Sequence, residues 1–184
     1  VIDYVAENEK DATNIAKKIL SYFQGDIKDW KADDQTQLSN IMPKDRRWSY
    51  PVRDIIKIIS DIEECTEIKP EYGKGIVTCF IRIEGKPFGL LANDSQHLGG
   101  AIDSEAADKA SSFIEMCSEY GLPIISLVDT PGFMVGPDSE KEGAVRRMSN
   151  LFKIGSKVKV PLTAIFLRKG YGLGAQAMVG GSLH

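Results

Sequence analysis

Three short apolar segments, each led by a proline, recur at nearly equal distances in the second half of the sequence. They are KPFGLLAN (86–93), LPIISLVD (122–129) and VPLTAIFL (160–167). Proline is tolerated at the start of a strand, where its missing N–H removes no needed ladder donor. The three segments are therefore predicted to be equivalent strands of a single sheet.

The stretches between these strands have helical periodicity. The first spans 103–121 and the second 139–158, and Gly121 and Gly155 are expected to end them. Strands that alternate with helices are normally parallel and joined by right-handed crossovers, so the pattern predicts an α/β fold. The residues expected to face the sheet are Ala106, Ala110, Phe113, Ile114 and Cys117 in the first helix, and Val145, Met148, Leu151, Phe152 and Ile154 in the second.

The beginning of the chain differs from this repeating part. Residues 1–23 are predicted to end in a helix that Asn8 caps, with Ile15, Ile19 and Phe23 on one face. Residues 24–48 are polar and charged without sustained periodicity, which is typical of a linker. The main domain is therefore expected to span 49–184.

Two further elements are expected at the start of this domain. A short helix is predicted after Ser49, which is a suitable cap, and Pro51 suits its first turn. Residues 75–93 predict two strands joined at Glu84-Gly85-Lys86. The isoleucines expected to face inward from the short helix are Ile55, Ile58, Ile59 and Ile62.

Composition argues against several functional classes. The formal net charge of −3 is unlike the strong basic patch of nucleic-acid-binding domains. No apolar stretch approaches the roughly 20 residues of a membrane span, and the acidic start of the chain is unlike a secretory signal. The three cysteines lack C-x-x-C spacing, which favours reduced thiols in a cytosolic protein. The two histidines stand outside any Cys/His cluster, so no structural zinc is expected.

In an open α/β sheet the ligand lies outside the carboxyl ends of the strands. Three loops occupy that position: NDSQHLGGAID (93–103), DTPGFMVGPD (129–138) and RKGYGLGAQ (168–176). In the third loop, bare amides that enter a helix predict an oxyanion hole. A glycine-rich turn that only lets the helix pack closely is an equal alternative. The spacing fits neither a dinucleotide fingerprint, because Ala177 replaces the third glycine, nor a P-loop.

Side chains in the other two loops are weaker candidates. Asp129, at a strand end, is a potential ligand or base, although an aspartate there more often caps the following turn. His97 is a potential general base without a visible orienting partner. Phe133 is more often a core residue than a stacking platform. No Ser-His-Asp order, paired carboxylates or metal-ligand spacing stands out, so chemistry here would depend on backbone donors and a bound cofactor.

Taken together, GGAID (99–103), VDTPGF (128–133) and RKGYG (168–172) resemble, in order and spacing, the carboxyl-terminal half of one enzyme family. This is the carboxyltransferase (β) subunit of biotin-dependent acyl-CoA carboxylases, of the propionyl-CoA and acetyl-CoA carboxylase type. The resemblance covers essentially the whole chain. It implies a crotonase-like spiral of β-β-α units, and it implies that residues 1–23 close a missing amino-terminal half and that the chain is a fragment with little activity alone.

The resemblance also implies a reaction and its site. A carboxyl group would pass from carboxybiotin to the α-carbon of a short acyl-CoA, and this chain would supply the biotin side. The backbone amides of Leu173 and Gly174, next to Gly172, would form the oxyanion hole for the biotin ureido oxygen. The family usually reads Y-G-G-A here, whereas this chain has Leu173 at the second glycine. Gly132 and Phe133 would line the biotin entrance, and Gln176 would stand where some relatives select the acyl group.

The implied partners are a biotin carboxyl carrier or biotin carboxylase subunit, further carboxyltransferase subunits and the acyl-CoA, with no nucleic acid, no metal and, for a carboxylase, no membrane. The expected compartment is the cytoplasm, or the mitochondrial matrix in a eukaryote. Two alternatives remain open. One is the carboxyltransferase subunit of a sodium-pumping acyl-CoA decarboxylase, and the other is a non-catalytic crotonase-like assembly module.

Overall fold

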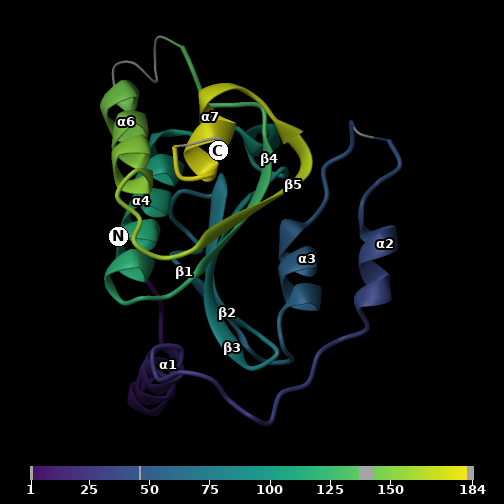
Figure 1. The fold of residues 1–184 in the computed structure, drawn as a ribbon, viewed down its shortest axis with the longest axis vertical. Coiled ribbons are helices and arrows are strands. Elements are labelled where there is room, and N and C mark those ends of the chain that lie inside the picture. Colours follow the sequence, from purple (N-terminus) through teal and green to yellow (C-terminus); the bar gives the residue numbers. More distant parts are fainter. Residues whose placement is uncertain (1, 46, 137–142, 182–184) are drawn as a thin grey trace.

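A computed structural model of the chain describes residues 2–45, 47–136 and 143–181. It contains a mixed sheet in which the strands lie side by side in chain order (Figure 1). β1, β2 and β3 pair antiparallel, while β3, β4 and β5 pair parallel. The parallel part contains the three proline-led segments, so their predicted equivalence is confirmed. The strands are β1 (Cys65–Ile68), β2 (Ile76–Ile83), β3 (Lys86–Asn93), β4 (Ile124–Thr130) and β5 (Leu162–Gly170).

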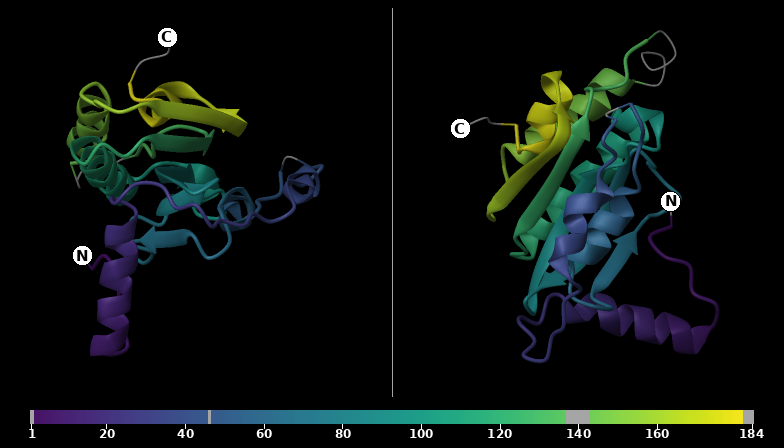
Figure 2. Two further views of the ribbon diagram at one scale, coloured as in Figure 1. Left: turned by 60° about the horizontal axis from the view of Figure 1, so that its bottom comes forward. Right: turned by 90° about the vertical axis from the view of Figure 1, so that its right-hand side faces the viewer.

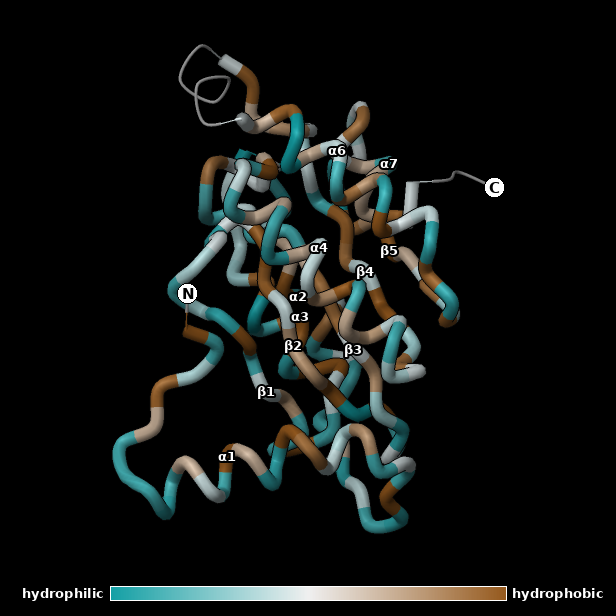
Figure 3. The backbone as a smooth tube through the Cα atoms, turned by 90° about the vertical axis from the view of Figure 1, so that its left-hand side faces the viewer, coloured by the Kyte–Doolittle hydropathy of each residue, from teal (hydrophilic) through white to brown (hydrophobic). Residues whose placement is uncertain are grey.

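Helices cover both faces of the sheet and create two cores (Figure 1). Side chains alternate along a strand, so Ile76 and Phe80 of β2 enter one core while Val77 and Ile81 enter the other. Hydrophobic residues accordingly concentrate along the central strands (Figure 3). The predicted α/β architecture of β-β-α units is confirmed. The first core contains α4 (Ser104–Glu119), α6 (Ala144–Gly155) and α7 (Gly172–Met178), and the second contains α3 (Val52–Ile59).

The first helix, α1 (Glu9–Ser21), projects away from the sheet (Figure 2). Asn8 caps it as predicted, because its side chain accepts the Asp11 N–H at 3.0 Å. No residue of α1 is buried, but Tyr22, directly after it, is fully buried and stacks on Phe80. The helix is thus anchored at its carboxyl end.

Residues 24–45 and 47–48 are mainly irregular. They contain one 3-10 turn, η1 (Gln35–Gln37), followed by the single-turn helix α2 (Leu38–Ile41). α2 lies outside α3 (Figure 1) and its apolar residues pack against the second core. This helical turn was not predicted from the sequence.

Three details of the sequence prediction are wrong. Helix α3 begins at Val52 after Pro51, so Ser49 does not cap it. Ile62 is 47% exposed because α3 ends at Ile59, before that position is reached. Val145 is 68% exposed because it lies on the outer side of the first turn of α6. Strand β1 was missed, and the predicted start of the second crossover helix, 139–142, lies outside the described residues.

The predicted connections at Glu84-Gly85 and at Gly121 are confirmed. Glu84 and Gly85 join β2 to β3 with positive φ values of 51° and 76°, a hairpin-turn conformation. Asp103 caps α4 by accepting the Ala106 N–H at 2.8 Å, a contact that was not predicted from the sequence. Gly121, with φ of +74°, ends that helix and returns the chain to β4. The carboxyl ends of β3, β4 and β5 are thereby brought to one edge.

Candidate active site

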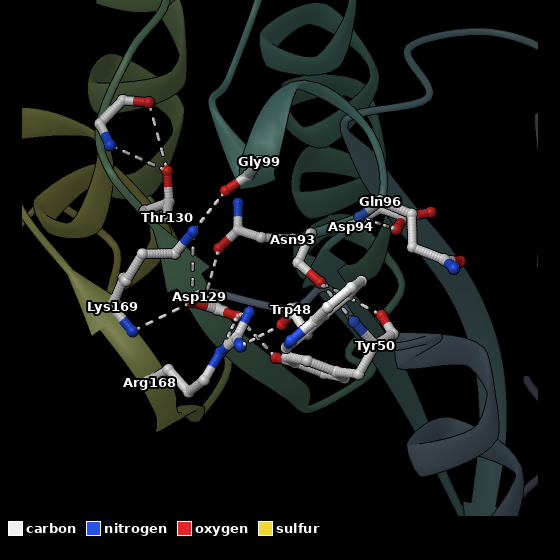
Figure 4. Close-up of polar contacts among 12 residues, drawn as sticks. Trp48, Tyr50, Asn93, Asp94, Gln96, Gly99, Asp129, Thr130, Arg168 and Lys169 are labelled. Carbon is white, nitrogen blue, oxygen red and sulfur yellow. Dashed lines mark hydrogen bonds and ion pairs between the residues drawn. The ribbon is translucent and has the colours of Figure 1, made fainter. Parts of the chain in front are cut away.

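The three predicted loops meet at the carboxyl ends of β3, β4 and β5 (Figure 4). The Asp129 N–H at the end of β4 donates to Asn93 Oδ1 at the end of β3, at 3.0 Å. The Lys169 N–H at the end of β5 donates to Asp129 Oδ1 at 3.0 Å. Lys169 Nζ reaches Gly99 O, in the loop after β3, at 2.5 Å. Hydrogen bonds therefore connect all three loops, as the parallel topology predicted.

The glycine-rich loop leads directly into the short helix α7. Tyr171 N donates to Thr130 O at 3.1 Å, and Ala175 N donates to Tyr171 O at 3.4 Å. Between them, the N–H groups of Gly172, Leu173 and Gly174 have no hydrogen-bond acceptor among the residues that the structure describes. The first amides of a helix have no partner within it. Three successive donors therefore remain at the end of β5, and the Leu173 side chain is 64% exposed.

Close contact with the β4 loop fixes α7 in place. A Cβ atom on Gly174 would lie 2.8 Å from the Cα and C atoms of Gly132. Only glycine therefore permits this approach. Gly132 has φ of +124°, its N–H donates to Thr130 Oγ1 at 3.1 Å, and its carbonyl accepts the Ile102 N–H at 3.0 Å. The sequence alternatives for this loop, close packing and free amides, are both present in the structure.

The two other residues predicted for this site have mainly structural contacts. The Phe133 ring is half-buried, with its centroid 6.0 Å from that of Phe152, so it packs toward α6 and the first core. The Gln176 side chain donates to Gly181 O at 3.3 Å, and Gly181 N donates back to Gln176 O at 2.9 Å. Gln176 thus engages the turn that follows α7.

Asp129 is fully buried and is surrounded by donors from distant parts of the chain (Figure 4). Its Oδ2 accepts the Tyr50 hydroxyl at 2.8 Å and Arg168 Nε at 3.1 Å. Burial, together with this hydrogen bond, raises the pKa of the Tyr50 phenol well above its ordinary value. The expectation that Asp129 caps the following turn is wrong, because Thr130 Oγ1 makes that contact with Gly132 N.

Tyr50 and Arg168 were not recognised from the sequence. Tyr50 is 79 residues from its partner Asp129. No local pattern marks such a pair, since only the folded sheet brings the two residues together. Arg168 belongs to the RKGYG motif, but its charge gave no indication of a buried ion pair.

His97 belongs to the amino-terminal end of α4. Its Nε2 lies 3.4 Å from Oδ2 of Asp103, the capping residue of α4. It therefore has an orienting carboxylate that the sequence did not reveal. Its ring also lies against Gly75, where an added Cβ would be 3.5 Å from His97 Cδ2. The imidazole thus lies between the amino-terminal end of α4 and Gly75.

Residues 2–45, 47–136 and 143–181 contain no cluster of three or more histidine, cysteine, aspartate or glutamate side chains suited to a metal ion. No helix in these ranges is long and apolar enough to cross a membrane.

The chain is similar to several known proteins. The chain is 35% identical over 179 residues to the methylmalonyl-CoA carboxyltransferase 12S subunit of Propionibacterium freudenreichii subsp. shermanii, covering 93% of this chain and 34% of that protein. It is 30% identical to the methylmalonyl-CoA decarboxylase subunit alpha of Veillonella parvula, covering 94% and 36%. A solved single-chain, multi-domain long-chain acyl-CoA carboxylase superposes with a TM-score of 0.97 at 52% identity, covering 99% of this chain and 19% of that chain.

The chain spans about a third of the length of these curated relatives. The family described as the carboxyl transferase domain matches residues 1–184. The sheet, the three loops at its carboxyl edge and these likenesses lead to one conclusion: the chain belongs to the carboxyl transferase domain family.

Proposed function

We propose that this chain supplies the biotin-side part of a carboxyltransferase active site, in which a carboxyl group passes from carboxybiotin to the α-carbon of an acyl-CoA. The observation that carries the proposal is the run of three amides, Gly172 to Gly174, without acceptors among the described residues. Such a run fits an oxygen atom that becomes negatively charged, because preorganised N–H groups stabilise developing charge. The transferase, decarboxylase and carboxylase names of the relatives support the same chemistry.

Carboxybiotin, when bound, would supply the carboxyl group and leave negative charge on its ureido oxygen, and the proton displaced from the acyl-CoA α-carbon would pass to biotin. The amides of Leu173 and Gly174 would donate to that oxygen. Their direction is set in advance, since Tyr171 is bonded to Thr130 and Gly174 lies against Gly132. A leucine in place of the family's usual glycine keeps the N–H, and its exposed side chain leaves the backbone contact unchanged.

The surrounding residues have secondary roles in this proposal. Gly132 and Phe133 form the wall of the biotin entrance through their backbone, which lies against Gly174. Gln176, one turn after the amides, influences which acyl group is accepted. Relatives named for methylmalonyl and for long-chain acyl groups are both similar to the chain, so short and long acyl-CoA esters are the substrate classes to compare.

The proposal extends to organisation and partners. Residues 1–23 would close an amino-terminal carboxyltransferase half, 24–48 would link the halves, and 49–184 would belong to the carboxyl-terminal half. The biotin carrier and biotin carboxylase would be partner subunits or further domains, and other carboxyltransferase subunits would complete the site. Free Cys65, Cys79 and Cys117 support a reducing compartment, the cytoplasm or the mitochondrial matrix.

A second candidate is decarboxylation of an acyl-CoA, which the similarity to methylmalonyl-CoA decarboxylase subunit alpha favours. It would use the same amides with the carboxyl group moving in the opposite direction, onto biotin. Purification of the intact protein with its natural partners, followed by assay in both directions, separates the two reactions.

The test of the site is Leu173→Pro in the intact protein. Proline removes the Leu173 N–H, which has no acceptor among the described residues, and proline is tolerated in the first turn of a helix. The matched control is Leu173→Ala, which trims the same exposed side chain and keeps the N–H. Loss of one oxyanion-hole donor is expected to lower kcat for carboxyl transfer with biotin by about 10²-fold to 10³-fold.

Leu173→Ala should remain within about threefold of the unmodified protein, because it leaves every backbone donor in place. Equal activities of the proline and alanine variants would contradict the oxyanion hole. An intact protein that assembles normally but transfers no carboxyl group, with or without these substitutions, would instead indicate the non-catalytic assembly module.

A further inference from the structure

Strand β5 bulges opposite Asp129. Val128 pairs with Phe166, and Thr130 pairs with Gly170, so Asp129 stands alone against three residues of β5. A bulge of this kind interrupts the ladder and leaves backbone groups unpaired. Here the Asp129 carboxylate replaces the ladder partner, because its Oδ1 accepts the Lys169 N–H at 3.0 Å.

The other oxygen of the same carboxylate fixes the rest of the bulge. Arg168 Nη2 lies 3.0 Å from Asp129 Oδ2, and the Arg168 side chain is only 9% exposed. Arg168 Nη1 also donates to Trp48 O at 2.7 Å, and its guanidinium lies 4.6 Å from the centre of the Tyr50 ring. The carboxylate therefore holds both β5 and the segment before α3 (Figure 4).

The bulge is followed immediately by the proposed oxyanion hole. Two residues after Lys169, Tyr171 N bonds to Thr130 O, and three residues later Gly174 lies against Gly132. The chain from β5 to α7 is thus attached to β4 and its loop at three successive points. Asp129 supplies the first of them, through its side chain.

We propose that Asp129 is a positioning residue for the amides of Leu173 and Gly174. Its buried carboxylate holds the β5 bulge in one geometry and so sets the direction from which α7 begins. The residue does not touch the reacting groups. The effect of Asp129 on catalysis rests on the proposed function, whereas its effect on the geometry of β5 and α7 does not.

The test variant is Asp129→Asn in the intact protein. Asparagine has nearly the same volume but one acceptor oxygen, which cannot serve Lys169 N on one side and Tyr50 with Arg168 on the other. The matched control is Asp61→Asn. Asp61 is also buried, 3% exposed, and accepts two backbone amides, Glu84 N and Gly85 N, at the β2–β3 turn.

Residue-resolved amide hydrogen exchange gives a readout that does not depend on activity. The informative amides are those of Tyr171 and Ala175, which are hydrogen-bonded and lie beyond the residue that Asp129 contacts. Asp129→Asn is expected to accelerate their exchange about tenfold or more, since loss of the Asp129 contacts lets the chain between β5 and α7 open locally. Asp61→Asn should leave both rates unchanged when each variant is measured equally far below its melting temperature.

Faster exchange at Lys169 alone, with Tyr171 and Ala175 still protected in a folded Asp129→Asn variant, would overturn the proposal. If Asp129→Asn does not fold, the double variant with Arg168→Gln, which removes the positive charge together with its carboxylate partner, is judged by the same two amides. Where the unmodified enzyme transfers carboxyl groups, kcat should fall about 10²-fold in the Asp129 variant with KM for the acyl-CoA within about twofold. An inactive unmodified enzyme would refute the proposed function and leave the exchange result to decide this inference.

Discussion

Lys109 gives a quantitative prediction about stability. Its side chain lies on α4 and is 2% exposed, and its Nζ has no hydrogen-bond partner among the described residues. Burial lowers the pKa of its ammonium group to about 8 from the ordinary value of 10.5, a shift that Glu67 opposes and Arg53 reinforces. At about 1.4 kcal/mol per pH unit, this difference corresponds to about 3 kcal/mol of destabilisation when the lysine is charged.

Replacement by an apolar side chain of similar length should remove this cost. Lys109→Met is expected to raise the free energy of unfolding at pH 7 by about 2–3 kcal/mol. The unfolded chain binds the additional proton between pH 8 and 10.5, so the stability contribution of Lys109 rises with pH across this window. The advantage of the methionine variant is therefore expected to be complete below pH 8 and to shrink as pH approaches 10.5.

Urea unfolding of both proteins from pH 6.5 to pH 10.5 measures this difference. Lys17→Met is the matched control, because Lys17 is exposed in the middle of α1, and it should change stability by less than about 0.5 kcal/mol at every pH. A Lys109→Met variant that is less stable than the unmodified protein at pH 7, or whose advantage does not change with pH, would contradict a buried, charged Lys109.

Two further substitutions test contacts around the site. Gly174→Ala should lower the free energy of unfolding by about 1–3 kcal/mol and reduce carboxyl transfer, because its Cβ would lie 2.8 Å from the Gly132 backbone. Thermal melting and transfer kinetics measure the two effects. An alanine variant with normal stability and normal kinetics would contradict the close packing. Asp103→Ala should lower the free energy of unfolding by about 1 kcal/mol, because the α4 cap is lost, while transfer activity is retained. A large loss of activity at normal stability would instead indicate that His97, which contacts Asp103, takes part in catalysis.

Local rules predicted the elements that create the site edge. The three proline-led strands, the Glu84-Gly85 turn and the Asn8 cap depend on residues close together in the chain, so the sequence alone indicates them. Strand β1 escaped because its four residues are too few for a visible alternation. Ile62 was misplaced because it keeps the helical spacing of apolar residues in the sequence, although α3 ends three residues earlier, at Ile59.

Long-range contacts could not be predicted in the same way. Asp129 was expected to act locally, but its partners Tyr50 and Arg168 come from elements that only the folded sheet brings together. The burial of Lys109 likewise depends on how α4 packs. The free amides at Gly172, Leu173 and Gly174 were anticipated because glycines mark the loop. The contacts of Asp129 with β5, which orient these amides in our proposal, have no sequence signature of their own.

The most direct test of the proposed biotin site is a structure of the intact protein with biocytin bound. The ureido oxygen is expected to lie about 2.7–3.1 Å from both the Leu173 and the Gly174 amide nitrogens, the range of an occupied oxyanion hole. A well-defined biotin ring whose ureido oxygen is bonded to other groups, with these two amides facing solvent, would contradict the proposed site.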